Sequence, residues 1–206
     1  SGESMFTGIV THCAPVSSAE MKEGILRLVI DVPSGFTKGL ERGASIAING
    51  VCLTAIEWDD SFVSFDVIDE TLNKTNLVGI QSVTLVNLER AARFGDEIGG
   101  HPLSGHIHTQ AELVRVEQDE ANVAMILSFE DAWKPYVISK GYIAINGCSL
   151  TIGKVEGNQF WLHLIPETLR VTNLDGMKPG TKLNIEIDHQ TQVIVDTVER
   201  YMASRD

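Results

Sequence analysis

The chain reads Ala47-Ile48-Asn49-Gly50-Val51-Cys52-Leu53-Thr54, and 97 residues later it reads Ala144-Ile145-Asn146-Gly147-Cys148-Ser149-Leu150-Thr151. The two stretches are identical at six of eight positions. Residues 69–77 recur in similar form, at the same offset, as residues 166–174. Solenoid repeats have periods of roughly 20–50 residues, so this offset is too long for a solenoid. Separate ungapped matches at one offset instead predict a duplicated domain.

The length of the chain agrees with two domains. A chain of 206 residues can hold one large domain or two small ones, and the repeat favours two. We expect a first domain over residues 5–96, a second over 97–190 and a C-terminal helix over 191–206. Each domain is close to the size at which an isolated core becomes marginal. Contact between the domains, or oligomerisation, is therefore expected to add stability.

Composition narrows the class of protein. The chain is 43% hydrophobic and 21% charged, which is typical of a soluble globular protein. A net charge of −12 argues against nucleic acid and anionic membranes as partners. No stretch approaches the ~20 apolar residues of a membrane helix, and no secretory signal opens the chain. The three cysteines, Cys13, Cys52 and Cys148, form no Cys-x-x-Cys pair. We therefore expect a cytoplasmic protein without a disulfide framework or a metal site.

Short apolar runs dominate both halves. Strands are expected at residues 25–32, 62–67 and 83–88 in the first half, and at residues 123–129, 160–164 and 183–187 in the second. Turn signals such as Asn49-Gly50 and Asn146-Gly147 separate these runs. Short helices are expected around residues 36–40, 70–73, 130–139 and 167–170. Many short strands separated by turns predict an all-β fold with a small antiparallel barrel in each half.

The tail differs from the rest of the chain. Residues 192–202 place Ile194, Val198 and Tyr201 on one face of a helix. This predicted amphipathic helix lies beyond the second repeat and needs an apolar surface to cover. It can pack against its own barrels or against copies of itself in an oligomer, and the periodicity does not separate these alternatives.

A histidine-rich segment joins the repeats. His101, His106 and His108 lie among several glycines, but a zinc site would need further ligands that are not close in sequence. The glycines indicate tight turns with close backbone approach. His106 aligns with Ile9 of the first half, which makes it a candidate for proton transfer near neutral pH. The alternative is a structural histidine, and we expect His101 and His108 to be structural or exposed.

Two further pairs of segments are candidates for binding. Cys52 and Ser149 align, and each lies two residues before an aligned threonine on the same face of an expected strand. Such side chains can hydrogen-bond a polar heterocycle, or they can be ordinary packed strand residues. Glu70-Thr71 and Glu167-Thr168 follow a strand in each half. They either begin a helix or contribute to binding.

Several motifs together resemble the riboflavin synthase family. They are Met5–Val10, Asn49–Thr54, Gly99–His106, Leu164–Leu169 and Asp196–Arg200. The resemblance runs in order from Met5 to about Met202 and includes the internal duplication. Each motif alone is weakly specific, and the set is highly specific.

The resemblance implies an activity and an assembly. The activity is a dismutation of two molecules of 6,7-dimethyl-8-ribityllumazine, in which one gives a four-carbon unit to the other. The products are riboflavin and 5-amino-6-ribitylamino-uracil, and no cofactor is needed. The implied fold is two six-stranded Greek-key barrels plus the C-terminal helix. The implied assembly is a homotrimer held by that helix, with possible association with lumazine synthase. The catalytic site would form between the first barrel of one subunit and the second barrel of a neighbour.

The resemblance also implies site residues. His106, Ser149 and Thr151 are expected to transfer protons and orient the substrate, with Ser45 and Cys52 opposing them and Asp188 contacting a ribityl hydroxyl or orienting a base. The first lumazine pocket is expected to contain Gly8, Ile9, Val10, Cys52, Leu53, Thr54, Asp66, Val67, Ile68, Asp69, Glu70 and Thr71. The second is expected to contain Gly105, His106, Ile107, Lys140, Ser149, Leu150, Thr151, His163, Leu164, Ile165, Pro166, Glu167 and Thr168. The family often has two cysteines before the first Leu-Thr, and Val51 replaces one of them here.

Two other functions fit the same fold. One is a non-catalytic lumazine- or flavin-binding paralogue, such as the lumazine proteins that serve as optical antennae. The other is the flavin-binding barrel of a reductase. Both halves keep their active-site pattern, with His106, Ser149 and Thr151 in place in the second half, which favours the enzyme over the first alternative.

Overall fold

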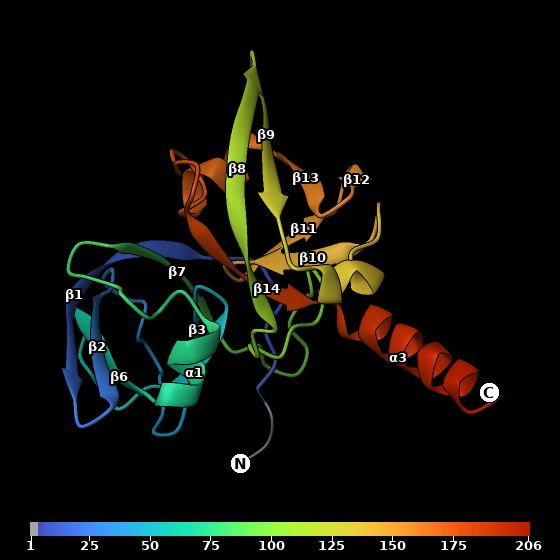
Figure 1. The fold of residues 1–206 in the computed structure, drawn as a ribbon. Coiled ribbons are helices and arrows are strands. Elements are labelled where there is room, and N and C mark those ends of the chain that lie inside the picture. The colour runs from blue at the N-terminus through green and yellow to red at the C-terminus, as the bar shows by residue number, and fades with distance from the viewer. Residues whose placement is uncertain (1–3) are drawn as a thin grey trace.

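The computed structural model describes residues 4–206 as two similar β-barrels followed by a protruding helix (Figure 1). The first barrel is one antiparallel sheet of order β4-β3-β7-β1-β2-β6-β5. Its strands are β1 (His12–Lys22), β2 (Ile25–Asp31), β3 (Ser45–Ile48), β4 (Val51–Thr54), β5 (Glu57–Trp58), β6 (Phe62–Val67) and β7 (Leu85–Arg90), and α1 spans Asp69–Lys74.

The second barrel repeats the first, strand for strand. Its order, β11-β10-β14-β8-β9-β13-β12, is the same order shifted by seven strands. The strands are β8 (Thr109–Asp119), β9 (Asn122–Ser128), β10 (Tyr142–Ile145), β11 (Cys148–Thr151), β12 (Val155–Glu156), β13 (Gln159–Leu164) and β14 (Lys182–Ile187). The helices are η1 (Asp131–Tyr136), α2 (Pro166–Val171) and α3 (His189–Ala203). The predicted duplication and all-β class are confirmed.

The barrels contain seven strands by hydrogen bonding, where we expected six. β4 pairs with β3, whereas β5 pairs with β6 at the other edge of the sheet. Only two residues separate β4 from β5, and the second of them, Ile56, donates its N–H to Ser64 O at 2.9 Å. β4 and β5 are therefore two parts of one bent segment that joins both edges of the sheet. Counted once, that segment restores the six expected strands.

The short helices are confirmed only in part. α1 and α2 form where Glu70-Thr71 and Glu167-Thr168 follow a strand. The segment expected around residues 130–139 is a short 3-10 helix, η1. No helix forms around residues 36–40, where the chain makes a series of turns. The reason is local, because Gly35 and Gly39 adopt φ values of 89° and 72° and interrupt any helical run.

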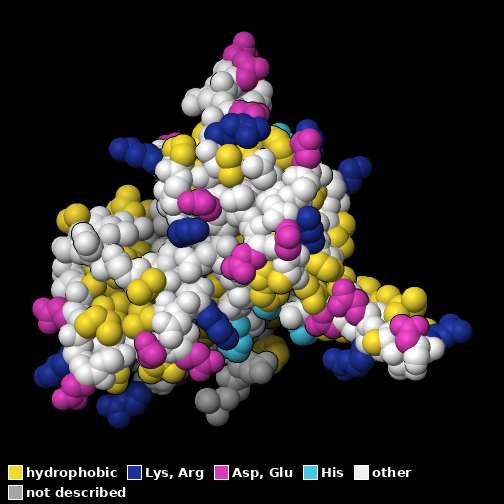
Figure 2. Space-filling view, viewed as in Figure 1, with side chains coloured by type: hydrophobic (Ala, Val, Ile, Leu, Met, Phe, Trp, Pro, Cys, Tyr) yellow, Lys and Arg dark blue, Asp and Glu magenta, His cyan; other side chains and the backbone are white. Residues whose placement is uncertain are grey.

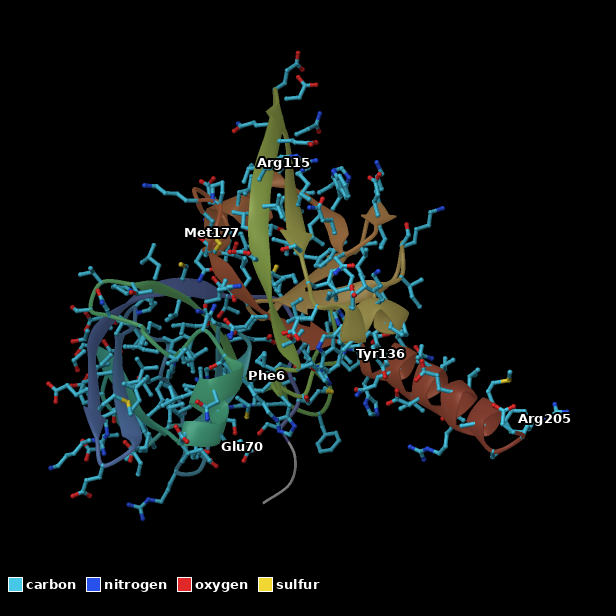
Figure 3. The ribbon with its side chains drawn as sticks, viewed as in Figure 1. Phe6, Glu70, Arg115, Tyr136, Met177 and Arg205 are labelled. Atoms are coloured by element: carbon cyan, nitrogen blue, oxygen red, sulfur yellow. The ribbon has the colours of Figure 1, made fainter. Side chains whose placement is uncertain are left out.

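The segments that precede the barrels cross over. Phe6 pairs with Leu103 through two backbone hydrogen bonds of 2.8 and 2.9 Å, and Phe6 lies between the barrels (Figure 3). Beyond this crossing, Val10 packs into the core of the second barrel. Ile107 packs into the core of the first. Each barrel is thus completed by a segment that precedes the other one.

An asparagine cluster docks the two barrels. Asn49, Asn76 and Asn87 of the first half meet their equivalents Asn146, Asn173 and Asn184. Asn184 Nδ2 donates to Asn49 O, and Asn87 Nδ2 donates to Asn146 O, both at 2.9 Å. A Cβ on Gly50 would lie 2.6 Å from the backbone nitrogen of Gly147. The repeated Asn-Gly turns therefore form the contact between barrels as well as reversing the chain.

The Asn184→Ala variant is expected to lower the free energy of unfolding by about 2–4 kcal/mol, because it leaves one buried and one partly buried backbone group without partners. These groups are the Asn76 N–H, bound by Asn184 Oδ1 at 2.7 Å, and the carbonyl of Asn49. Urea denaturation measures the change. Asn122→Ala, at the exposed first residue of β9, is the control. Equal stabilities of the two variants would show that the cluster does not stabilise the fold.

α3 extends away from both barrels (Figure 1). Its N-terminus is capped by Asp188, whose carboxylate accepts from Thr191 N at 3.3 Å. Tyr136 of η1 donates a hydrogen bond to Asp196, and Tyr136 lies beside the helix (Figure 3). No residue of α3 is buried. Ile194, at 58% exposure, and Tyr201, at 59%, represent an apolar face that remains open (Figure 2).

This geometry excludes one of the two alternatives for the C-terminal helix, which was packing against its own barrels. The amphipathic helix is confirmed, but it does not pack its apolar face on its own barrels. Across residues 4–206, no helix combines the length and apolar character needed to cross a membrane.

Candidate functional site

Each barrel has a cavity at its β4 or β11 edge. The first has a volume of about 350 Å³, within the roughly 300–1,000 Å³ typical of small-molecule sites. It is bounded by β4, by α1 and by the segment that precedes β8. Its lining residues are Val51, Cys52, Glu70, Thr71, Lys74, Thr75, Gly105, His106 and Ile107.

The second cavity is the counterpart of the first, with a volume of about 490 Å³. It is bounded by β11, by α2 and by the segment that precedes β1. Its lining residues are Ile9, Gly99, Gly100, Tyr142, Ser149, Leu150, Thr151, Ile152, Gly153, His163, Ile165 and Thr168. Three positions are equivalent between the cavities: Cys52 and Ser149, Thr71 and Thr168, and His106 and Ile9. The chain therefore has two pockets of one design with different side chains.

One segment closes each pocket: the residues before β1 and the residues before β8. Each of these closing segments covers the pocket of the opposite barrel from the one that we expected. The resemblance to the riboflavin synthase family implied Gly8–Val10 for the first pocket and Gly105–Ile107 for the second. Instead, Gly8 O accepts from Ser149 N at 2.8 Å, and Gly105 O accepts from Cys52 N at 2.9 Å. The crossing at Phe6 and Leu103 is the reason, because it sends each segment to the other barrel. His106 is consequently a residue of the first pocket.

Two glycines make this closure possible. Gly8 and Gly105 adopt φ values of 79° and 81°, which favour glycine. A Cβ on Gly8 would lie 2.5 Å from Ser149 Cβ, and a Cβ on Gly105 would lie 2.5 Å from Cys52 Cβ. Larger residues at either position would push the closing segment away from the strand that it covers.

Only some of the expected residues line these cavities. Those that do are Cys52, Glu70, Thr71, Gly105, His106 and Ile107 in the first, and Ile9, Ser149, Leu150, Thr151, His163, Ile165 and Thr168 in the second. Leu53, Val67, Val10 and Leu164 are buried in the cores. The exposed residues Thr54, Asp66, Ile68, Asp69, Pro166 and Glu167 lie outside the lining sets.

Some of the remaining candidates have structural contacts of their own. Asp66 forms an ion pair with Arg27 at 2.6 Å, and Glu167 pairs with Arg170 at 2.6 Å. Lys140 lies outside both cavities, and its N–H donates to Ile152 O at 2.7 Å. Ser45 Oγ accepts from Ser4 Oγ at 2.8 Å. Asp188 caps α3, so its role toward a substrate stays a prediction.

A histidine–serine pair was missed by sequence reasoning. His101, which we expected to be structural or exposed, is only 3% exposed, and its Nδ1 lies 2.6 Å from Ser149 Oγ. Its ring stacks on Tyr142 at a centroid distance of 4.9 Å. Burial lowers the pKa of His101, and the charge of Asp188 opposes this effect. With the proton on Nε2, the neutral ring accepts a hydrogen bond from the Ser149 hydroxyl at Nδ1.

One signal could have revealed this pair. Gly99 and Gly100 precede His101, and a Cβ on Gly100 would lie 2.6 Å from Ser149 Cβ. The glycines therefore mark the close approach that brings His101 to Ser149. Among the described residues, His101 Nε2 is the one buried side-chain nitrogen or oxygen without a hydrogen-bond partner.

The other histidines and thiols of this region differ in environment. His106 is exposed at the mouth of the first pocket. His108 is held by Ile187 N at 3.0 Å and Gln192 Oε1 at 3.2 Å, so the predicted structural role fits. Cys148 is buried in the core of the second barrel, and this burial raises the pKa of its thiol to about 12. Cys52 is half-buried at the pocket wall.

Comparison with known proteins agrees with the duplicated site. The family profile described as "Lumazine binding domain" matches twice, at residues 7–91 and 104–188. The fold and its two equivalent pockets therefore define a protein with two lumazine-binding domains. Riboflavin synthase of Escherichia coli (strain K12) is 47% identical over 98% of this chain and 95% of that protein. Riboflavin synthase of Chlamydia pneumoniae is 40% identical over 97% of this chain and 98% of that protein. The chain belongs to the riboflavin synthase family.

A solved structure supports the same fold. The crystal structure of LumP complexed with riboflavin superimposes with a TM-score of 0.82. It is 25% identical in sequence and covers 89% of this chain and 100% of that chain. A further crystal structure, of LumP complexed with 6,7-dimethyl-8-(1'-D-ribityl) lumazine, has a TM-score of 0.79 at 24% identity.

Proposed function

We propose that this protein catalyses the dismutation of two molecules of 6,7-dimethyl-8-ribityllumazine. A four-carbon unit passes from one molecule to the other, which yields riboflavin and 5-amino-6-ribitylamino-uracil. The observation that carries the proposal is the presence of two equivalent pockets in one chain. A reaction between two copies of one substrate requires two similar binding sites, and the duplication supplies them.

The pockets suit a reaction that consists of orientation and proton transfer. The methyl group at C7 of the lumazine is acidic, so the protein must chiefly align the two substrates and move protons. Well-oriented reactants reach effective molarities of roughly 10⁵–10⁸ M. His106 is available for proton transfer in the first pocket, and the His101–Ser149 pair is available in the second. Thr151 lies beside Ser149 to orient the substrate.

We extend the proposal to the assembly. The reacting pair forms between the first pocket of one subunit and the second pocket of a neighbour, in a homotrimer joined through α3. The uncovered apolar face of α3 supports this assignment. Residues 5–96 and 97–190 are then the two lumazine-binding domains, and residues 191–206 are the oligomerisation helix. A cytoplasmic location fits the three free cysteines, and association with lumazine synthase stays a prediction.

Turnover tests the proposal directly. The purified protein is incubated with 6,7-dimethyl-8-ribityllumazine, and the absorbance of riboflavin is followed together with the loss of substrate. We expect one riboflavin for every two lumazines consumed, without added cofactor. The similarity to LumP favours a second candidate, a non-catalytic lumazine- or flavin-binding protein. Binding without turnover by the oligomeric protein would establish that candidate and exclude the enzyme.

A further inference from the structure

Two buried glutamates occupy equivalent positions in the barrels. Glu89 lies in β7 of the first barrel and is 6% exposed, and Glu186 lies in β14 of the second and is 5% exposed. Neither carboxylate forms an ion pair with a cationic side chain of the described residues. Removing a carboxylate from water without such a partner is unfavourable unless hydrogen bonds satisfy it. The backbone and hydroxyl groups that donate hydrogen bonds to these two carboxylates therefore indicate what the glutamates do.

Glu186 binds the segment that closes the first pocket. Its Oε2 accepts from Ser104 N at 2.9 Å, and its Oε1 accepts from Gly105 N at 2.9 Å. Ser104 Oγ lies 3.4 Å from the same carboxylate and accepts from His106 N at 3.1 Å. On its other side, Gly105 O accepts from Cys52 N. The Gly105 backbone is thus held between Glu186 of the second barrel and Cys52 of the first.

Glu89 repeats the arrangement at the second pocket. Its Oε2 accepts from Thr7 N and Thr7 Oγ1, both at 2.8 Å, and its Oε1 accepts from Gly8 N at 3.0 Å. Thr7 Oγ1 in turn accepts from Ile9 N at 3.2 Å. Gly8 O then accepts from Ser149 N at 2.8 Å. Each glutamate therefore belongs to one barrel and fixes the closing segment of the other barrel's pocket.

Both carboxylates show the effect of burial. Burial raises the pKa of Glu186 to about 7, although the hydrogen bonds from Ser104 and Gly105 lower it. Burial also raises the pKa of Glu89, against the hydrogen bonds from Thr7 and Gly8. A buried carboxylate of this kind adds little to the stability of the fold compared with an apolar residue of similar size. Its retention in both halves is explained by a geometry that only a two-oxygen acceptor provides.

We propose that Glu89 and Glu186 are positioning residues that act across the barrel interface. Glu186 sets the position of His106 in the first pocket, and Glu89 sets the position of Ile9 in the second. The inference rests on the proposed function insofar as these pockets bind lumazines and flavins. It goes beyond that function because it couples the affinity of each pocket to a residue of the opposite barrel.

Hydrogen exchange tests the coupling without any ligand. Glutamine is close to glutamate in size but offers one acceptor oxygen and an amide that cannot accept. In Glu186→Gln we expect the Cys52 amide to exchange at least about tenfold faster, with the Ser149 amide unchanged. In Glu89→Gln we expect the reverse pattern. Mass spectrometry of peptides from residues 50–54 and 147–151 separates the two, and each variant is the control for the other.

Site-resolved binding tests the consequence for the pockets. Riboflavin is titrated into the intact oligomer while methyl NMR signals of Val51 and Ile165 report the first and second pockets. Glu186→Gln should weaken binding at the first pocket about tenfold and at the second less than about twofold. Glu89→Gln should do the opposite. Ser104→Ala and Thr7→Val remove the linking hydroxyls while leaving the carboxylates, and should give the same patterns more weakly.

The outcomes are distinguishable. A crossed pattern in exchange and in binding supports the positioning role. Effects confined to a variant's own barrel, equal effects in both barrels, or no effect would overturn it. If the unaltered protein neither binds riboflavin nor converts the lumazine, the proposed function fails. The exchange measurement still decides the positioning role in that case.

Discussion

A chain that ends before Gln192 is expected to be a monomer with less than about one hundredth of the full activity. The reason is the open apolar face of α3, where Ile194, Val198 and Tyr201 are each more than half exposed. Burying one such side chain contributes about 1.5–3 kcal/mol, so a cluster of them is sufficient to hold subunits together. If the reacting lumazines lie in pockets of different subunits, a monomer cannot align them. Size-exclusion chromatography with light scattering and the riboflavin assay measure both effects.

A full-length variant separates loss of the face from loss of the tail. The double variant Ile194→Asp with Val198→Asp keeps the cap at Asp188 and the contact between Asp196 and Tyr136. It should reproduce the monomer and the loss of turnover. Arg200→Glu changes the net charge by the same two units on the opposite side of the helix, and should leave the oligomer intact. An active monomer from the double variant would contradict a site shared between subunits.

Much of the fold followed from the repeat and from strand patterns. The strands expected at residues 25–32, 62–67 and 160–164 correspond to β2, β6 and β13. The long strands β1 and β8 were not expected, because their outer halves are exposed or only half-buried and carry no regular apolar alternation. They form hairpins with β2 and β9, and the second hairpin projects beyond the barrel (Figure 1). Pairing with a neighbour, which periodicity does not encode, extends these strands.

The sequence predicted which types of residue line the two pockets. It did not predict how the segments that carry them are arranged in space. The equivalence of Cys52 with Ser149 was visible in the alignment of the halves, and both line a pocket. The crossing at Phe6 was not visible, because an exchange of segments between two similar barrels leaves the sequence pattern of each unchanged. The His101–Ser149 contact depends on that same three-dimensional arrangement. Sequence alignment of the halves therefore predicted which positions correspond, but not which barrel they serve.

His106→Ala is expected to lower turnover by about 10²–10⁴-fold, the usual contribution of a general acid or base. His106 is held at the mouth of the first pocket by the Glu186 and Ser104 hydrogen bonds, and it stands on the segment that covers Cys52. Because its ring is exposed, removing it changes little of the packed pocket wall. Riboflavin affinity at the first pocket should therefore change by less than about threefold. Single-turnover kinetics and equilibrium binding provide the two numbers.

The duplication supplies the matched control for this variant. Ile9 is the equivalent residue of the second pocket and carries no group that can move a proton. Ile9→Ala should weaken ligand binding at the second pocket through lost apolar contact, while the rate at saturating lumazine falls by less than about tenfold. An unchanged rate in His106→Ala, or equal losses of rate in the two variants, would remove His106 from the proton path. The His101–Ser149 pair would then be the remaining proton-transfer group of the two pockets, because its hydrogen bond at 2.6 Å already joins a neutral ring to a hydroxyl at the pocket wall.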